Sequence, residues 1–335
     1  MKILVTRTDR LGDVLLATPV LKQLKETYPQ AEITFLVQKL WMDVLQYADV
    51  RLMEYAPNAP DLVERLKKEK FDFAVVLRDE KPVSLAIKKA GIPYRIGPYS
   101  TLRSFFLFNH GKWQRRSRCK MHEAQYNLQL LEKLPHAEKL PSKESLHSWV
   151  VYSTSAQEVI EKWLSAQHLT PGQYVCVHPG SSGSSRYLKI ERMIALVQEL
   201  IQKNISVVLT GGMTELELLH RIAEAIQGKV HIFAGKPLSH LAELYRHSSA
   251  VIAHGTGPLH LAAAVDAPVY ALFPPIFVLS EKRWGPLTAQ REVWTPHVPC
   301  PAHYRCLGEK CPYFDCMDRF KIEEAVQKIL EWNRK

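Results

Sequence analysis

Short apolar runs alternate with amphipathic stretches along almost the whole chain. The first run, "KILVT", is followed by an apolar-periodic stretch over residues 14–28, which predicts a helix that ends before Pro29. The runs "EITFLV" and "FAVVL" are in turn followed by helical patterns, "DLVERLKKEK" and "PVSLAIKKAG". Runs of Val, Ile and Leu between amphipathic helices are typical of a parallel sheet that is covered on both faces. The pattern therefore predicts an α/β fold.

The alternation stops near residue 150 and then restarts. The polar stretch "PHAEKLPSKESLHSW" separates the two halves, and 335 residues suit two domains of ordinary size. We therefore expect two Rossmann-like, doubly wound domains, residues 1–150 and 151–335. In the second domain the periodicity predicts helices over 188–203, 214–227, 237–246, 258–265 and 321–333. The last of these is expected to pack back across the two halves.

One stretch breaks the rhythm. Residues 99–121, "YSTLRSFFLFNHGKWQRRSRCKM", mix aromatic with six basic residues and show no clear period. A run of charge is most often a solvated loop. The aromatic residues among the basic ones also fit a loop that contacts a substrate or faces a membrane.

The charge balance favours an anionic partner. Lys and Arg number 44 against 34 Asp and Glu, a net charge of +10. No signal peptide is apparent, because Arg7, Asp9 and Arg10 directly follow a short apolar run. The long apolar window "LHLAAAVDAPVYALFPPIFVL" contains His260, Asp266 and three prolines, so it fits a helix, a turn and a buried strand better than a membrane span. We expect a cytoplasmic protein whose membrane contact, if any, is peripheral on the inner membrane.

Four of the six cysteines lie close together in "CPAHYRCLGEKCPYFDC", namely Cys300, Cys306, Cys311 and Cys316. Their spacing lacks the CxxC pairs that are typical of structural zinc sites, so no metal is expected. In a reducing compartment the simplest interpretation is a loop of free thiols.

Three loops of the second domain share one design, in which a strand is followed by small residues and then by a helix. They are "VHPGSSGSSRY", "LTGGMTE" and "AHGTGPLH". Small residues let the backbone approach an anion, and a helix N-terminus supplies N–H groups, so the three loops together fit a nucleotide diphosphate. None matches the P-loop or the GxGxxG pattern. The candidate ligand-binding residues are His178, Ser181, Ser182, Gly211, Glu215, Thr256, Gly257 and His260. The two histidines could equally be satisfied polar groups at a strand end and a helix start.

The first candidate for chemistry is Asp13, which follows Gly12 where a helix begins after the first strand. Asp is a good N-cap, so the residue could be purely structural. It could also be a general base that accepts a proton from a hydroxyl group. Near a helix N-terminus its pKa is expected to be low, so that the carboxylate stays ionised.

Several motifs together resemble one family. "TRTDRLGDVLLATPVLKQLK", "MHEAQYNLQLL", "VHPGSSG", "LTGGMTE" and "GTGPLHLAAAVDAPVYALF" are similar in order and spacing to the family 9 glycosyltransferases, the heptosyltransferases of lipopolysaccharide core assembly. The resemblance implies a GT-B fold with a cleft between two Rossmann-like domains. It also implies metal-independent, inverting transfer of heptose from ADP-heptose to an anionic, lipid-linked inner-core acceptor, without a cofactor.

The resemblance also assigns roles to residues. It implies that Asp13 is the catalytic base, that the first domain binds the acceptor and that the second binds the donor. The acceptor would meet the basic residues Arg7, Arg10, Arg103, Arg115 and Arg116, since Arg grips phosphate and carboxylate bidentately. The donor side would include Gly12 and the loops of the second domain. Two donor-side positions depart from the family: Ser185 replaces a Lys, with Arg186 beside it, and Gly255 replaces an acidic residue.

Three other functions are alternatives to sugar transfer. Loss of the acidic residue and the Lys favours a non-catalytic GT-B protein that binds a glycan, a nucleotide or a partner protein, whereas the intact Asp13 favours an enzyme. Nucleic-acid binding is supported by net charge alone and by no recognised motif. An NAD-linked oxidoreductase is disfavoured because no GxGxxG follows the first strand.

Overall fold

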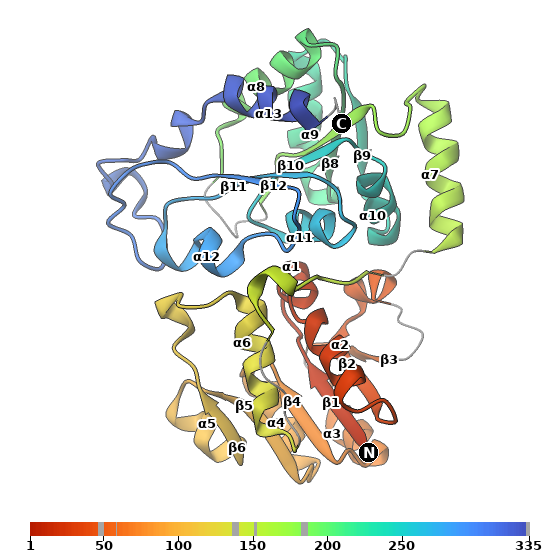
Figure 1. Cartoon of the computed structure of the whole chain (residues 1–335), viewed down its shortest axis with the longest axis vertical. Coiled ribbons are helices and arrows are strands. Elements are labelled where there is room, and N and C mark those ends of the chain that lie inside the picture. Colours follow the sequence, from red (N-terminus) through yellow and green to blue (C-terminus); the bar gives the residue numbers. More distant parts are fainter. Residues whose placement is uncertain (46–49, 58, 136–140, 151–152, 182–186, 333–335) are drawn as a thin grey trace. The chain divides into compact units, whose positions relative to one another are not determined.

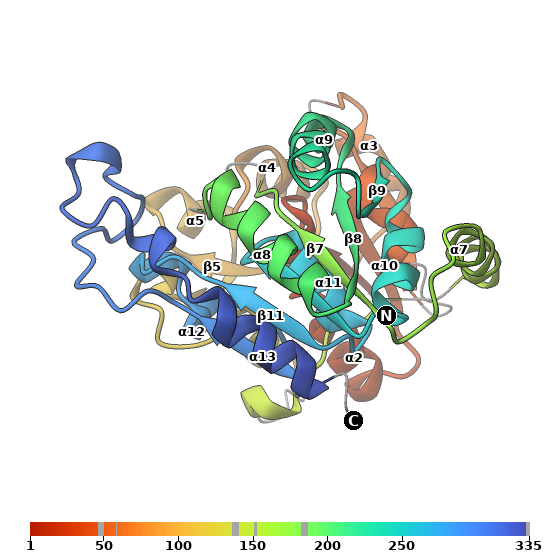
Figure 2. The same cartoon turned by 90° about the horizontal axis from the view of Figure 1, so that it is seen from above.

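Two six-stranded parallel sheets organise the described part of the chain, one in each of two units, Met1–Val151 and Tyr152–Lys335 (Figures 1 and 2). The structure is a computed structural model. It describes every residue except 46–49, 58, 136–140, 151–152, 182–186 and 333–335. The expected α/β class with doubly wound parallel sheets is confirmed.

The sheet of the first unit has the strand order β3-β2-β1-β4-β5-β6. Its strands are β1 (Lys2–Thr6), β2 (Glu32–Gln38), β3 (Val50–Tyr55), β4 (Phe73–Val76), β5 (Tyr94–Tyr99) and β6 (His110–Trp113). The order reverses between β1 and β4, where Ile3 pairs with Phe73 and Thr6 with Val76. In such sheets ligands bind beyond the carboxyl ends of the strands at this switch point.

Helices cover both faces of this sheet (Figure 1). They are α1 (Leu11–Leu15), α2 (Thr18–Thr27), α3 (Leu62–Glu69), α4 (Lys81–Lys89), α5 (Leu102–Leu107) and α6 (Glu123–Gln129). Short 3₁₀ turns span Lys39–Val44, Arg116–Arg118, Leu130–Lys133 and Lys143–Ser145. Helices α3 and α4 bury Leu66, Val83 and Ile87 against Leu4 and Val76 of the sheet. Helices α2 and α6 pack on each other.

The helix expected over residues 14–28 is two helices, and Pro19 explains the break. Proline has no N–H, so it cannot donate to the carbonyl of Leu15 four residues earlier. The hydroxyl of Thr18 donates to that carbonyl instead, at 2.8 Å. The chain therefore turns after α1 and starts again at Thr18.

The stretch 99–121, which shows no period in the sequence, contains a helix and an edge strand. Thr101 caps α5, because its side chain accepts from the N–H of Ser104 while the Ser104 hydroxyl accepts from the N–H of Thr101. Strand β6 has four residues and pairs with β5, and Gly111 allows the ring of Tyr99 to lie against it. Elements of four to six residues are too short to give a recognisable period.

The second unit repeats the topology, with strand order β12-β11-β10-β7-β8-β9. The strands are β7 (Tyr174–His178), β8 (Ser206–Gly211), β9 (His231–Ala234), β10 (Ala250–His254), β11 (Val269–Leu272) and β12 (Arg291–Trp294). The helices are α7 (Thr154–Ala166), α8 (Ile190–Gln202), α9 (Leu216–Ala225), α10 (Leu238–Arg246), α11 (Gly257–Ala264), α12 (Glu281–Trp284) and α13 (Ile322–Trp332). Strands β10, β7 and β8 are neighbours, so the three small-residue loops leave the same edge of one sheet.

The last helix, α13, belongs to the core of the second unit. It packs on α8, and Ile322, Ala325, Val326 and Ile329 are buried against that helix and the sheet. Figure 2 shows the two helices side by side over the strands. The packing that the structure describes is thus within one unit, and a contact across the two halves stays an expectation. No helix in the described ranges is long and apolar enough to cross a membrane.

Candidate functional site

Asp13 lies in the first turn of α1, just beyond the carboxyl end of β1. The residue before the helix is Arg10, whose backbone is extended and whose side chain makes no cap. Asp13 is therefore not an N-cap, and a structural role as a cap does not explain it. Its carboxylate is mostly buried and accepts from a guanidinium N–H of Arg7.

Arg7 is the centre of a buried ion cluster. Its side chain is 2% exposed, and it donates to Asp9 at 2.8 Å and to Glu123 at 3.1 Å in addition to Asp13. Burial acts to lower the pKa of Arg7, but the three carboxylates outweigh it and raise the pKa further above its ordinary value. Arg7 therefore stays charged, and its guanidinium donates to four side chains of the first unit. Its expected contact with an acceptor stays a prediction.

Helix α6 supplies two further side chains of the cluster, those of Glu123 and Asn127. Glu123 begins that helix and also accepts from Arg116 at 2.5 Å. Asn127, one turn later, accepts from Arg7 at 3.2 Å and from Arg116 at 3.1 Å, and donates to the carbonyl of Leu16 at 3.1 Å. Arg116 is thus a partner of this network, and its expected contact with an acceptor stays a prediction.

Sequence reasoning did not single out Glu123 and Asn127 as site residues. They lie 116 and 120 residues from Arg7, so no local pattern connects them. The signal that could have found them is the motif "MHEAQYNLQLL", in which an acid and an amide four residues apart share one helix face.

The pKa of Asp13 is raised to about 6, mainly by burial and opposed chiefly by the positive charge of Arg7. The negative charges of Asp9 and Glu123 raise it further. The expected low pKa was therefore wrong, because the short helix contributes less than the loss of solvent around the carboxyl. A carboxylate with this pKa is mostly ionised at pH 7 and can still accept a proton readily.

The other basic candidates of the first unit have different surroundings. Arg10 and Arg115 are exposed, whereas Arg103 pairs with Asp79 at 2.7 Å. Gly12 is buried in the first turn of α1 beside Asp13. Arg10, Arg103 and Arg115 are therefore the three candidates whose side chains are open to solvent, and Arg103 is also paired.

In the second unit, a chain of hydrogen bonds joins the ends of β7 and β8. His178 Nδ1 lies 3.0 Å from the hydroxyl of Thr210, which lies 2.9 Å from the hydroxyl of Tyr245. Burial lowers the pKa of His178 to about 4, so this ring is neutral at pH 7. Its Nε2 is 3.5 Å from Glu215, and this contact is therefore not an ion pair at that pH.

Glu215 is packed closely against the loop that follows β7. It accepts from the N–H of Gly212 at 2.9 Å, and a Cβ at Gly180 would lie 1.8 Å from its Oε1. Gly180 is thus required for this carboxylate position. Gly211 lies at the end of β8 directly beside it. The structure brings the loops after β7 and β8 together, as the sequence predicted.

The loop after β10 contributes the remaining candidates. Thr256 precedes α11, Gly257 begins that helix, and His260 is buried within it. His254 accepts from the N–H of Leu188 at 3.1 Å, which ties the end of the β7 loop to β10. Ser181 is buried in that loop. The predicted residues Ser182, Ser185 and Arg186 lie outside the described residues.

Gly255 occupies the place of the acidic residue of the family pattern. A Cβ there would lie 2.6 Å from the ring of Phe273, which is buried at the end of β11. The ring leaves no room for an acidic side chain at this position without rearrangement. Glycine in place of the family's acidic residue at position 255 is therefore consistent with the Phe273 ring that packs against it.

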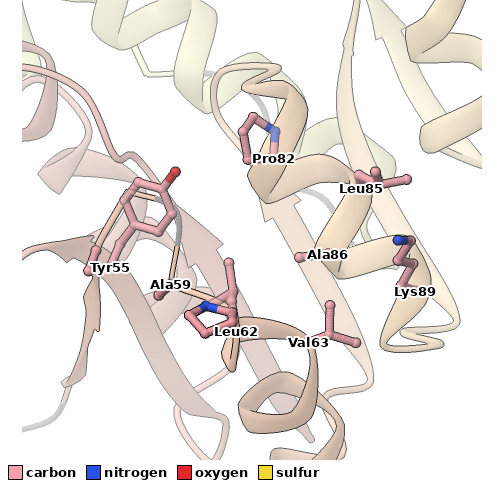
Figure 3. Close-up of a pocket in the computed structure, with 10 residues that line it drawn as sticks. Tyr55, Ala59, Leu62, Val63, Pro82, Leu85, Ala86 and Lys89 are labelled. Carbon is pink, nitrogen blue, oxygen red and sulfur yellow. The ribbon is translucent and has the colours of Figure 1, made fainter.

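Two cavities in the described part of the chain contain none of the predicted ligand-binding residues. One, of about 150 Å³, lies between α3 and α4 and is lined by Tyr55, Leu62, Leu85 and Lys89 among others (Figure 3). The other, of about 10 Å³, is lined by Cys300, Cys306, Cys311 and Cys316 together with apolar side chains. All six cysteines of the chain are described and form no disulfide. Within the described ranges, no group of three or more metal-ligating side chains is placed to hold an ion.

Comparison with known proteins relates the chain to glycosyltransferases. The family model of glycosyltransferase family 9 (heptosyltransferase) matches residues 60–313. A Haemophilus influenzae protein, whose name gives glycosyltransferase and no substrate, is 29% identical over 298 residues, covering 85% of this chain and 86% of that protein. Lipopolysaccharide heptosyltransferase 3 of Escherichia coli K12 is 24% identical over 283 residues, with coverage of 78% and 79%.

A solved structure shows the same fold. The structure of Escherichia coli ADP-heptose lipopolysaccharide heptosyltransferase II matches with a TM-score of 0.78 at 20% identity, covering 100% of this chain and 99% of that chain. Two six-stranded parallel sheets of the same topology agree with the GT-B architecture. On the family match and this fold, the chain belongs to glycosyltransferase family 9, the family of the heptosyltransferases.

Proposed function

We propose that this glycosyltransferase transfers heptose from ADP-heptose, with inversion and without a metal ion, to an anionic, lipid-linked inner-core acceptor of lipopolysaccharide. The observation that carries the proposal is the Asp13 carboxylate, held by Arg7 beyond the carboxyl end of β1 and shifted to a pKa of about 6. Related proteins named heptosyltransferases support the sugar, and the name of the solved relative supports the ADP donor.

The proposed reaction begins with a proton transfer. The acceptor hydroxyl gives its proton to Asp13 as its oxygen attacks the anomeric carbon of the donor. The bond from that carbon to the diphosphate breaks, and ADP leaves with the bonding electrons. Attack from the face opposite ADP gives inversion. Arg7 holds the carboxylate in place throughout, because its two other carboxylate partners, Asp9 and Glu123, keep it fixed when Asp13 is protonated.

The loops of the second unit are proposed to hold the nucleotide diphosphate. A neutral His178 can donate a hydrogen bond to a phosphate without a change of charge. Small residues at Gly180 and Gly211 let the backbone approach the anion, and the N-terminus of α11, at Gly257, begins just after the end of β10. Fixed dipoles of this kind can stabilise the negative charge that develops on the leaving group.

The acceptor is proposed to lie on the cytoplasmic face of the inner membrane, with which the protein associates peripherally. The exposed side chains of Arg10 and Arg115 are suited to its phosphates or carboxylates, since a guanidinium binds such groups bidentately.

A second candidate function is a non-catalytic GT-B protein that binds a nucleotide or a glycan. The observation that favours it is Phe273, whose ring occupies the space that an acidic side chain at position 255 would need. A donor site altered in this way could bind a nucleotide without supporting turnover.

Calorimetric titration with ADP and then ADP-heptose, each with magnesium and with EDTA, tests the donor assignment. We expect binding in EDTA that is tighter for the sugar conjugate than for ADP. The Glu215→Gln variant should bind more weakly, because the Glu215 carboxylate accepts from Gly212 and packs against the loop after β7. Glu217→Gln, which changes an exposed carboxylate in the first turn of α9, serves as the matched control. Absence of binding by ADP and other nucleotide diphosphates would contradict the donor proposal. Tight ADP binding without turnover would favour the second candidate.

A further inference from the structure

The positive charge of this chain is concentrated in one segment. Residues 81–120 contain ten Lys and Arg and no Asp or Glu, so this segment alone carries an excess equal to the net charge of +10 of the whole chain. The segment forms α4, β5, α5 and β6 and the 3₁₀ turn at Arg116–Arg118. These elements lie together at the β6 edge of the sheet of the first unit (Figure 1).

The same segment exposes large apolar side chains. It holds six of the fourteen such side chains in the described part of the chain, namely Leu85, Tyr94, Leu102, Phe105, Phe106 and Trp113. Leu102 is 79% exposed and Phe106 67%. Together with Phe105 they occupy positions i, i+3 and i+4 of α5, so they form one apolar stripe on the helix. The helix buries Ser104 and Leu107 instead, so its apolar stripe faces solvent.

The exposed rings are held in a fixed arrangement. Tyr99 stacks on Phe105 with ring centres 4.3 Å apart, and Trp113 contacts Phe105 edge-on at 5.1 Å. Trp113 is itself 66% exposed. The capping box fixes the start of α5, and the Tyr99 ring packs against Gly111 of β6. The stripe is therefore a built surface and not a loop of unfixed side chains.

Cationic side chains lie beside the stripe and follow it in the chain. Lys88 of α4 donates to the carbonyl of Phe106 at 2.8 Å, which places its ammonium group beside the stripe. Arg103 on α5 is 41% exposed and pairs with Asp79. Arg115, Arg118 and Lys120 follow Trp113 in the chain and are exposed. Exposed apolar side chains suit the acyl layer of a phospholipid surface, and the neighbouring cations suit its anionic headgroups.

We propose that this face, defined by Leu102, Phe105, Phe106 and Trp113 and called the α5 face, docks on a bilayer that contains anionic phospholipid. The apolar side chains would enter the boundary between headgroups and acyl chains, where Trp and Phe are favoured. The cations would meet lipid phosphates. A second copy of the chain is a poorer occupant, because a two-fold interface would bring two positively charged segments together. The inference deepens the proposed function, whose acceptor is lipid-linked.

Sedimentation with vesicles tests the α5 face without donor or acceptor. The full chain is mixed with vesicles of phosphatidylcholine and phosphatidylglycerol at 3:1 and with vesicles of phosphatidylcholine alone. We expect binding to the anionic vesicles that weakens as salt is raised. The Leu102→Ser/Phe106→Ser variant should bind the anionic vesicles at least about tenfold more weakly than the parent, because two exposed apolar side chains are removed without loss of core packing. Tyr304→Ser, at a side chain 65% exposed in the second unit, is the matched control and should bind like the parent.

A second variant separates charge from apolar contact. Arg115→Gln/Lys120→Gln keeps the stripe and should weaken binding to the anionic vesicles and lower its salt dependence. Unchanged binding of the Leu102→Ser/Phe106→Ser variant, or equal binding to both kinds of vesicle, would overturn the proposal. So would self-association of the parent chain that this variant abolishes. Failure of the parent chain to bind ADP would instead count against the proposed function and would not bear on the docking face.

Discussion

The pH dependence of sugar transfer gives a direct prediction from the Asp13 environment. A general base with a pKa of about 6 is about 90% ionised at pH 7 and about 9% ionised at pH 5, so kcat/KM should fall about tenfold over that interval. A carboxylate at the ordinary value of 3.8 would lose only about 6%. The raised pKa therefore moves the acid limb of the profile into a range that is easily measured.

The assay is release of ADP from ADP-heptose in the presence of acceptor, followed from pH 4.5 to 8, with circular dichroism at each pH to show that the chain remains folded. Glu123→Gln should move the acid limb to lower pH, because the negative charge of Glu123 raises the pKa of Asp13. Glu132→Gln, a carboxylate that pairs with Lys112 and not with Arg7, is the matched control. A limb near pH 4 in the folded parent, or no limb, would refute the reasoning.

Three further predictions concern stability, measured by urea unfolding. Arg7→Gln leaves buried carboxylates without their cation and should cost about 3–5 kcal/mol, whereas Arg10→Gln at an exposed position should stay within about 0.5 kcal/mol; equal effects would argue against the cluster. Gly255→Ala presses on the buried ring of Phe273 and should cost about 1–3 kcal/mol, and a neutral result would mean that the ring moves freely. His178 is neutral in the folded state down to about pH 4, so the unfolded chain binds more protons between pH 6.5 and 4 and stability should fall there by roughly 3 kcal/mol. His178→Gln should lose less over the same range, and an equal loss would contradict this cause.

The alternation of apolar runs and helices predicted the fold class, because parallel strands buried on both faces differ so clearly from amphipathic helices. Shorter elements were missed. Strand β12 (Arg291–Trp294) has two charged residues among its four, and α5 carries its apolar stripe on the solvent side. Periodicity identifies an element by the face it buries, so an element that exposes its apolar face gives a misleading pattern.

Only part of the candidate site could be predicted from the sequence. Position alone indicated Asp13 and the three small-residue loops, since residues that follow parallel strands gather at one sheet edge. The roles of Arg7 and Arg116 were not predictable, because both depend on Glu123 and Asn127 from a distant helix. The pKa of Asp13 depends on burial and on three charges, those of Arg7, Asp9 and Glu123, which surround it only in the folded chain.

The central claim is that Asp13 is the base for sugar transfer, and the Asp13→Asn variant tests it most directly. Asn has nearly the same shape and can still accept a hydrogen bond from Arg7, but it cannot take a proton from the acceptor hydroxyl. We predict a turnover rate about 10²–10⁴-fold lower than that of the parent, with ADP-heptose binding within about twofold of it. Turnover at the parental rate in a folded Asp13→Asn protein would contradict the account.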